Sequence, residues 1–175
     1  LRDAPALDAV LCVDSDNIHA ESEGLGEKMR QDLWDHVGRT MFDDISGGGW
    51  QSSFTGDWLS REVMNDYGDN IREKLTPMLS PSTRVLEIGC ASGISLFRLA
   101  PLVGEYVGTD LSPEILARTT AEIERRGLAN VRLQHCPAHE IDTLNEHGFD
   151  VVVINSVLQC FSGHNYLRDV IIKAV

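Results

Sequence analysis

A glycine-containing turn lies near the middle of the chain and has the composition of a ligand-binding loop. It spans residues 87–93 and reads EIGCASG. Gly89 permits a tight turn, and the small Ala91 and Gly93 let the backbone approach a ligand. The helix predicted to follow would point free N–H groups toward that ligand. These residues favour a nucleotide-like ligand.

Two acidic residues flank this turn in the predicted fold. Asp110 ends the next predicted strand, where a carboxylate can accept hydrogen bonds from both hydroxyls of a ribose. Its alternative role is a turn or capping carboxylate before the helix that begins at Pro113. Glu87 could receive a positively charged group or order the loop. The turn reads G-x-A-x-G and not G-x-G-x-x-G, which disfavours NAD or FAD and with them an oxidoreductase.

Alternating strands and helices must position these residues. The sequence predicts strands at 84–88, 106–109, 131–133 and 149–155, helices at 92–102, 113–126 and 166–175, and a helical turn at 138–144. This alternation implies right-handed crossovers and a parallel sheet, so the predicted fold is α/β, doubly wound and Rossmann-like. We expect the strand at 149–155 to be fully buried. Because so apolar a strand would make an aggregation-prone edge, we expect further strands in a parent protein.

The part before the sheet divides into two further zones. Residues 1–24 read as a leader or linker with a short strand at 7–13, and residues 25–80 as a helical lid region with helices at 27–42 and 61–79. Residues 81–175 form the predicted, incomplete core. Between the two helices, Trp50 and Phe54 stand in a glycine-rich loop. That loop either packs on the domain surface or covers a ligand site as a mobile lid.

Composition excludes several classes of protein. The 175 residues are 42% hydrophobic and 24% charged, as in one globular domain. Fifteen basic against 27 acidic residues give a net charge of −12, which repels nucleic acid. No apolar run approaches the ~20 residues of a membrane span, and no signal segment or initiator Met is present. The chain therefore reads as a soluble piece of a longer protein.

Cysteine and histidine usage indicates a cytoplasmic protein and no metal. The four cysteines contain no C-x-x-C pair, which fits reduced thiols. His135 and His139 are spaced like a metal pair, but no third ligand is apparent. His164 is a possible base or, more simply, a polar loop residue.

Three segments together resemble a known family. Residues 85–93, 107–112 and 149–159 are similar to successive motifs of class I S-adenosylmethionine-dependent methyltransferases. More narrowly, residues 49–56 (GWQSSFTG) and 154–161 (INSVLQCF) resemble the methyltransferase domains embedded in nonribosomal peptide synthetases. The resemblance implies S-adenosylmethionine as cofactor.

The resemblance also implies a set of cofactor contacts. Glu87 and the two glycines would surround the methionine end, Asp110 would take the ribose and Leu111 would lie along the adenine. The family usually has glycine where Ala91 stands. It commonly has an acidic residue after the third strand, where His139 or Glu140 would have to serve. The implied cofactor-binding residues are Glu87, Gly89, Cys90, Ala91, Gly93, Asp110, Leu111, Ala138, His139 and Asn155.

Methyl transfer from a sulfonium needs positioning and a site without competing water. Asn155 and Gln159 are the predicted catalytic residues, which would hold the substrate amide or amine, while Trp50 and Phe54 close over it. The alternatives are a helix cap for Asn155 and an ordinary surface amide for Gln159.

The resemblance finally implies a substrate and partners. The substrate would be an aminoacyl or acyl group on a carrier protein, methylated on nitrogen. Neighbouring synthetase domains would be partners, since residues 1–11 look similar to the tail of an adenylation domain. Carbon methylation in a hybrid polyketide synthase, and a non-catalytic module with the cofactor fold, are the alternatives.

Overall fold

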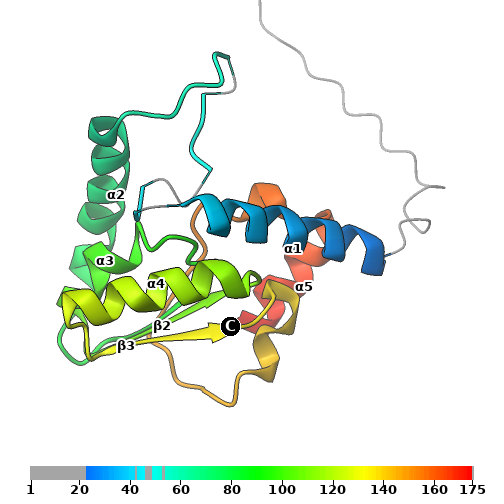
Figure 1. Cartoon of the computed structure of the whole chain (residues 1–175). Helices are drawn as coiled ribbons and strands as arrows, with labels where there is room; N and C mark the ends of the chain where they lie inside the picture. Colours follow the sequence, from blue (N-terminus) through cyan, green and yellow to red (C-terminus); the bar gives the residue numbers. More distant parts are fainter. Residues whose placement is uncertain (1–22, 42, 46–48, 53, 175) are drawn as a thin grey trace, which may run out of the picture.

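A computed structural model describes residues 23–41, 43–45, 49–52 and 54–174 (Figure 1). The strand predicted at 7–13 and nearly all of the leader lie outside these residues. The elements are α1 (Glu23–Thr40), α2 (Arg61–Leu75), η2 (Thr76–Met78), β1 (Arg84–Ile88), α3 (Leu96–Leu99), η3 (Ala100–Leu102), β2 (Glu105–Asp110), α4 (Pro113–Arg126), β3 (Val131–His135), η4 (Ala138–Thr143), β4 (Val151–Val153), η5 (Leu158–Cys160) and α5 (His164–Ala174).

The strands form one parallel four-stranded sheet in the order β3-β2-β1-β4. This confirms the predicted α/β, doubly wound fold. Ile88 is paired with Thr109, and Asp110 with His135, so β1, β2 and β3 end at the same edge of the sheet. The turn after β1 and the carboxylate that ends β2 are brought together there.

Successive side chains of the central strands point to opposite faces of the sheet, and helices cover both faces. Val85 and Tyr106 point to one face and pack with α3 and α4. Their neighbours Leu86 and Val107 point to the other face and pack with η4 and α5. Two apolar layers thus hold β1 and β2, and with them the ends of these strands, in place.

The structure corrects two predicted elements. The helix predicted at 92–102 begins only at Leu96 and ends as a 3₁₀ turn, because Gly93 has a φ of +89° and Pro101 follows α3. The strand predicted to be fully buried at 149–155 is wrong in both length and burial. It spans Val151–Val153, and its first two residues are half-buried, because β4 pairs only with β1 among the described strands.

Helix α1 packs against α4 (Figure 1) and is held there by close packing and by hydrogen bonds. A Cβ added to Gly38 of α1 would stand 2.9 Å from the backbone nitrogen of Ile115. The guanidinium of Arg118 on α4 donates to the carbonyl oxygens of Arg39 and Met41 at 2.9 and 3.0 Å. The end of α1 is thereby fixed above the sheet edge. No helix in the described part of the chain has the length and apolar character needed to cross a membrane.

Candidate functional site

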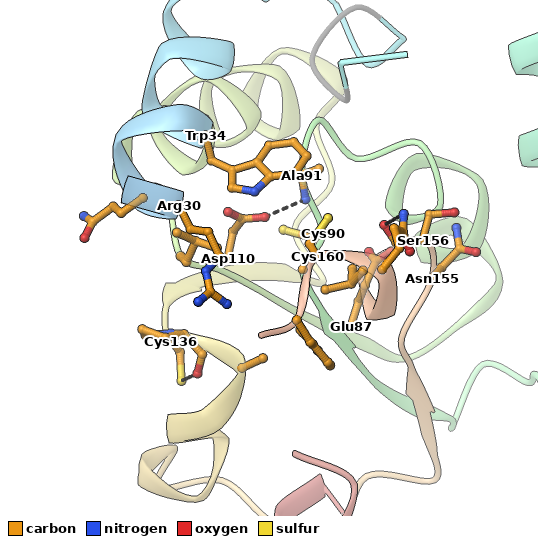
Figure 2. A pocket seen from close by; sticks show the side chains of 18 of the residues that line it. Arg30, Trp34, Glu87, Cys90, Ala91, Asp110, Cys136, Asn155, Ser156 and Cys160 are labelled. Atoms are coloured by element: carbon orange, nitrogen blue, oxygen red, sulfur yellow. Dashed lines mark hydrogen bonds between the residues drawn. The ribbon is translucent and has the colours of Figure 1, made fainter. Parts of the chain in front are cut away.

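A cavity of about 550 Å³ opens at the carboxyl ends of β1 and β2, below α1 (Figure 2). Its volume is in the range of small-molecule sites. The residues predicted from sequence that line it are Trp50, Glu87, Gly89, Cys90, Ala91, Asp110, Leu111, Ala138, His139, Asn155 and Gln159. The structure does not bring Phe54 to the cavity, since that side chain is 99% exposed, and Gly93 lies behind the wall against Phe97.

Glu87 is the buried acid of the site. Its side chain is 2% exposed, and the Tyr106 hydroxyl donates to its Oε2 at 2.8 Å. Burial raises the pKa of this carboxyl to about 8, although the hydrogen bonds from Tyr106 and Ser95 act in the opposite direction. Glu87 is therefore mainly protonated at neutral pH in the protein alone. A cation bound beside it would favour its ionised form.

Asp110 joins the turn after β1 to the start of α4. Its Oδ2 accepts from the Ala91 backbone N–H at 3.0 Å, and its Oδ1 accepts from the Ser112 N–H at 3.0 Å. Burial raises the pKa of the carboxyl, and these backbone donors oppose the rise. Each oxygen keeps acceptor capacity for a further donor. Asp110 thus serves as a turn carboxylate and can still bind a ribose.

The turn after β1 is shaped by residues with positive φ. Gly89 has a φ of +77°, and a Cβ there would stand 2.5 Å from Val157 Cγ2. The backbone N–H groups of Gly89 and Cys90 both donate to the Thr109 carbonyl at 2.8 Å. Glycine is therefore required at position 89, where the turn lies against the loop after β4.

Ala91 also has a positive φ, +44°, a region that costs an L-residue about 1–2 kcal/mol. We expect Ala91→Gly to raise the free energy of unfolding by about 0.5–1 kcal/mol, since part of the gain is lost to the greater freedom of glycine in the unfolded chain. Urea denaturation measures the change. Ala117→Gly, within α4, is the matched control and should lower stability by about 1 kcal/mol. Equal losses in both variants would show that Ala91 carries no strain.

The predicted catalytic amides both line the cavity. The Asn155 side chain donates to Ser95 Oγ at 3.2 Å, and that of Gln159 donates to the Ser156 carbonyl at 2.7 Å. Asn155 caps no helix, since η5 begins only at Leu158 and its N-cap residue is Val157. Asn155 is instead bonded to Ser95, a residue that also lowers the pKa of Glu87.

At the other end of the cavity lie the residues considered for adenine. His139 Nδ1 is 3.0 Å from the Tyr166 hydroxyl, and His135 Nε2 is 3.0 Å from the Leu111 carbonyl oxygen. Glu140 also lines the cavity. Within the described residues, no group of three or more His, Cys, Asp or Glu side chains is arranged to hold a metal ion.

The sequence predicted a helical lid region that includes α1, but it did not identify the residues of α1 that line the cavity. Arg30 and Trp34 line the cavity from this helix, with the Arg30 guanidinium directed between Asp110 and Cys136, and Trp34 above Asp110 and Ala91 (Figure 2). Their four-residue spacing predicts a shared helix face. The surface that this face covers could not be predicted from sequence, because α1 is far from the sheet along the chain.

Residues 79–170 match the family model described as a methyltransferase domain. The chain belongs to this family. This match confirms the predicted resemblance to class I S-adenosylmethionine-dependent methyltransferases, and in particular to the domains of nonribosomal peptide synthetases. Family membership implies S-adenosylmethionine as the methyl donor.

Relatives of the methyltransferase domain occur within very large proteins. It is 40% identical over 146 residues, 82% of the chain, to a probable non-canonical nonribosomal peptide synthetase, CymA, of Salinispora arenicola. It is 31% identical over 176 aligned residues, 92% of the chain, to enniatin synthetase of Fusarium oxysporum. The chain spans 2% of the length of the first of these proteins and 6% of the second.

A solved structure shares the fold of the methyltransferase domain. Phosphoethanolamine N-methyltransferase 1 of Haemonchus contortus, in complex with phosphoethanolamine and S-adenosylhomocysteine, superposes with a TM-score of 0.69. The match covers 89% of this chain and 30% of that one at 15% identity, so it shows the fold alone.

Proposed function

We propose that this methyltransferase domain transfers a methyl group from S-adenosylmethionine to the nitrogen of an aminoacyl group held on a carrier protein of a nonribosomal peptide synthetase. The observation that carries the proposal is the cavity, which brings Glu87 and Asp110 together with Asn155 and Gln159. The first pair suits the cofactor and the second pair suits a polar substrate. The names of the relatives support the setting in a synthetase.

The residues present fit the cofactor chemically. Among the described residues, no cationic side chain bonds the buried carboxyl of Glu87, so the positively charged methionine end would supply such a partner. Asp110 retains acceptor capacity for the ribose hydroxyls, while Leu111 and His139 line the cavity near the position proposed for adenine. Arg30 and Trp34 would cover this end from α1.

The reaction itself is an in-line displacement. The neutral amine nitrogen would bond to the methyl carbon while the carbon–sulfur bond breaks and S-adenosylhomocysteine is released, and the methylated ammonium would then lose its proton to solvent. The contribution of the protein is orientation and exclusion of water. Asn155 would orient the substrate, because its side chain is held by Ser95 at 3.2 Å and lines the cavity. Gln159 would contact the substrate from the next turn.

The two regions predicted from sequence have different roles in this proposal. We propose that residues 81–175 provide the cofactor-binding part and residues 25–80 provide the cover, of which α1 lies on α4. In this proposal, a carrier protein and neighbouring synthetase domains are partners of the domain and also contribute to substrate choice.

The test is methyl transfer to an aminoacyl carrier protein in the presence of S-adenosylmethionine. We expect mass spectrometry to find one added methyl group, and hydrolysis of the product to release an N-methyl amino acid. A C-methyl amino acid would favour the carbon methyltransferase of a hybrid synthase. Binding of S-adenosylhomocysteine without any methyl transfer would favour a non-catalytic module and contradict the proposal.

A further inference from the structure

Within the part of the chain that the structure describes, one buried side-chain nitrogen of a cavity-lining residue has no hydrogen-bond partner. The indole N–H of Trp50 is buried and unpaired among the described residues, and Trp50 lines the cavity. Buried donors are almost always paired, because leaving one unpaired costs free energy. An unpaired donor in the wall of a ligand cavity is suited to a ligand that brings a hydrogen-bond acceptor.

The position of this indole is set by two elements. Residues 50–52 pair with residues 57–59: the Leu59 N–H donates to the Trp50 carbonyl at 2.9 Å, and Gln51 forms an antiparallel β-bridge with Trp58. The Trp50 ring also packs on the Tyr67 ring of α2, with centroids 5.1 Å apart. The backbone hydrogen bond to Leu59 and the ring contact with Tyr67 therefore hold Trp50 in place. The indole N–H takes part in neither contact.

The same contacts locate Trp50 at the substrate end of the cavity. The Tyr67 hydroxyl lies 2.5 Å from Ser156 Oγ, in the loop after β4. Ser156 has a φ of +54° and follows Asn155, the proposed substrate contact. Strained non-glycine residues of this kind gather at functional sites. Trp50 and Ser156 thus line the cavity beside Asn155, and Tyr67 supports both from outside the cavity.

We propose that the Trp50 indole N–H donates a hydrogen bond to the carbonyl oxygen of the methyl acceptor. The inference rests on the proposed function, and it specifies that the acceptor is an amine with a neighbouring carbonyl group. An N–H donor bonded to the amine would occupy the lone pair that attacks the methyl group. The carbonyl oxygen of an aminoacyl thioester accepts the bond without that conflict and brings the amine to a fixed position.

The test compares two ligands and two variants in the complex with S-adenosylhomocysteine. One ligand is an aminoacyl thioester of N-acetylcysteamine, and the other is the matched thioether, in which a methylene replaces the carbonyl. Trp50→Phe keeps an aromatic ring and removes the N–H. We expect it to weaken binding of the thioester about tenfold, the scale of one hydrogen bond in a buried site, and to leave binding of the thioether unchanged.

Tyr67→Phe is the control for a structural effect. It keeps the ring that packs on Trp50 and removes the hydroxyl that contacts Ser156. We expect this variant to retain the wild-type preference for the thioester over the thioether. A role of Trp50 in packing alone would instead make Trp50→Phe weaken both ligands equally.

A spectroscopic readout reports on the hydrogen bond itself. In the ¹⁵N-labelled protein, the indole resonance that disappears in Trp50→Phe should move downfield when the thioester binds, but not when the thioether binds. The inference is wrong if that resonance ignores the thioester, or if Trp50→Phe binds both ligands as the wild type does. Methyl transfer by the wild type would then leave the proposed function intact. Failure of the wild type to bind S-adenosylhomocysteine or to methylate any aminoacyl carrier would overturn both.

Discussion

Glu87→Gln is expected to weaken binding of S-adenosylhomocysteine by about 100-fold or more. The wild-type carboxylate would face the ammonium of the methionine end in a buried site, and removing one partner of a buried ion pair costs about 3–5 kcal/mol. Glutamine keeps the shape and can still accept from the Tyr106 hydroxyl. Calorimetry measures the affinity. An unchanged affinity would mean that Glu87 orders the loop and does not receive the cofactor.

The same carboxyl should couple cofactor binding to pH. Because its pKa is about 8 in the protein alone, most molecules carry the proton at pH 7. A cationic ligand favours the ionised form, so we expect binding at pH 7 to release close to one proton. Calorimetry in buffers of different ionisation enthalpy counts that proton. Glu87→Gln should abolish the release.

Glu87→Gln should lower the affinity for S-adenosylhomocysteine but raise the free energy of unfolding. The folded pKa of Glu87, about 8, lies above the model-peptide value of 4.5, so the folded state holds this proton more tightly. The resulting stability is fully present below about pH 4.5 and is lost as the pH rises to 8. Glutamine has no charge to bury. We therefore expect Glu87→Gln to exceed the wild type in free energy of unfolding at pH 8–9 by at least about 1 kcal/mol, the equivalent of one pKa unit.

Thermal unfolding at pH 6 and pH 9 checks this stability prediction. The difference between variant and wild type should be larger at pH 9. Glu73→Gln, at an exposed position of α2, is the matched control and should show no such pH-dependent gain. A constant difference at the two pH values would contradict the high pKa of Glu87.

Asp110→Ala is the second change with a large expected effect. We expect it to weaken binding of S-adenosylhomocysteine by about 1–3 kcal/mol, the scale of hydrogen bonds to a charged group. Since Asp110 also accepts from the N–H groups of Ala91 and Ser112, its loss would lower stability as well. Affinity must therefore be measured below the unfolding transition, with Asp110→Asn as a milder second variant.

A ligand without ribose hydroxyls separates these two effects of Asp110. The wild type should lose affinity for the 2′,3′-dideoxy analogue of S-adenosylhomocysteine, whereas Asp110→Ala should bind the two ligands about equally. Such a cycle isolates the contact between carboxylate and ribose from general damage to the turn. An equal loss in both proteins would show that Asp110 acts only as a turn carboxylate.

The meeting of Glu87, Gly89 and Asp110 at one edge of the sheet was predictable because local sequence builds it. The apolar strand 84–88, the small residues of the turn and the acid that ends the next strand are separated by short stretches of regular structure. In a parallel sheet such strand ends meet at one edge whatever surrounds them. Glu87, Gly89 and Asp110 therefore lie where the sequence predicted.

The positions of Arg30, Trp34 and Trp50 around the cavity depended on tertiary structure. Nothing in the local sequence shows that Gly38 lets α1 pack on α4 and so brings Arg30 and Trp34 over the cavity. Likewise, the local sequence does not show that Trp50 packs on Tyr67 with its indole N–H buried and unpaired among the described residues, while the neighbouring Phe54 is exposed. Contacts between segments distant in sequence depend on how well whole surfaces fit. Periodicity and turn residues report only on each segment itself.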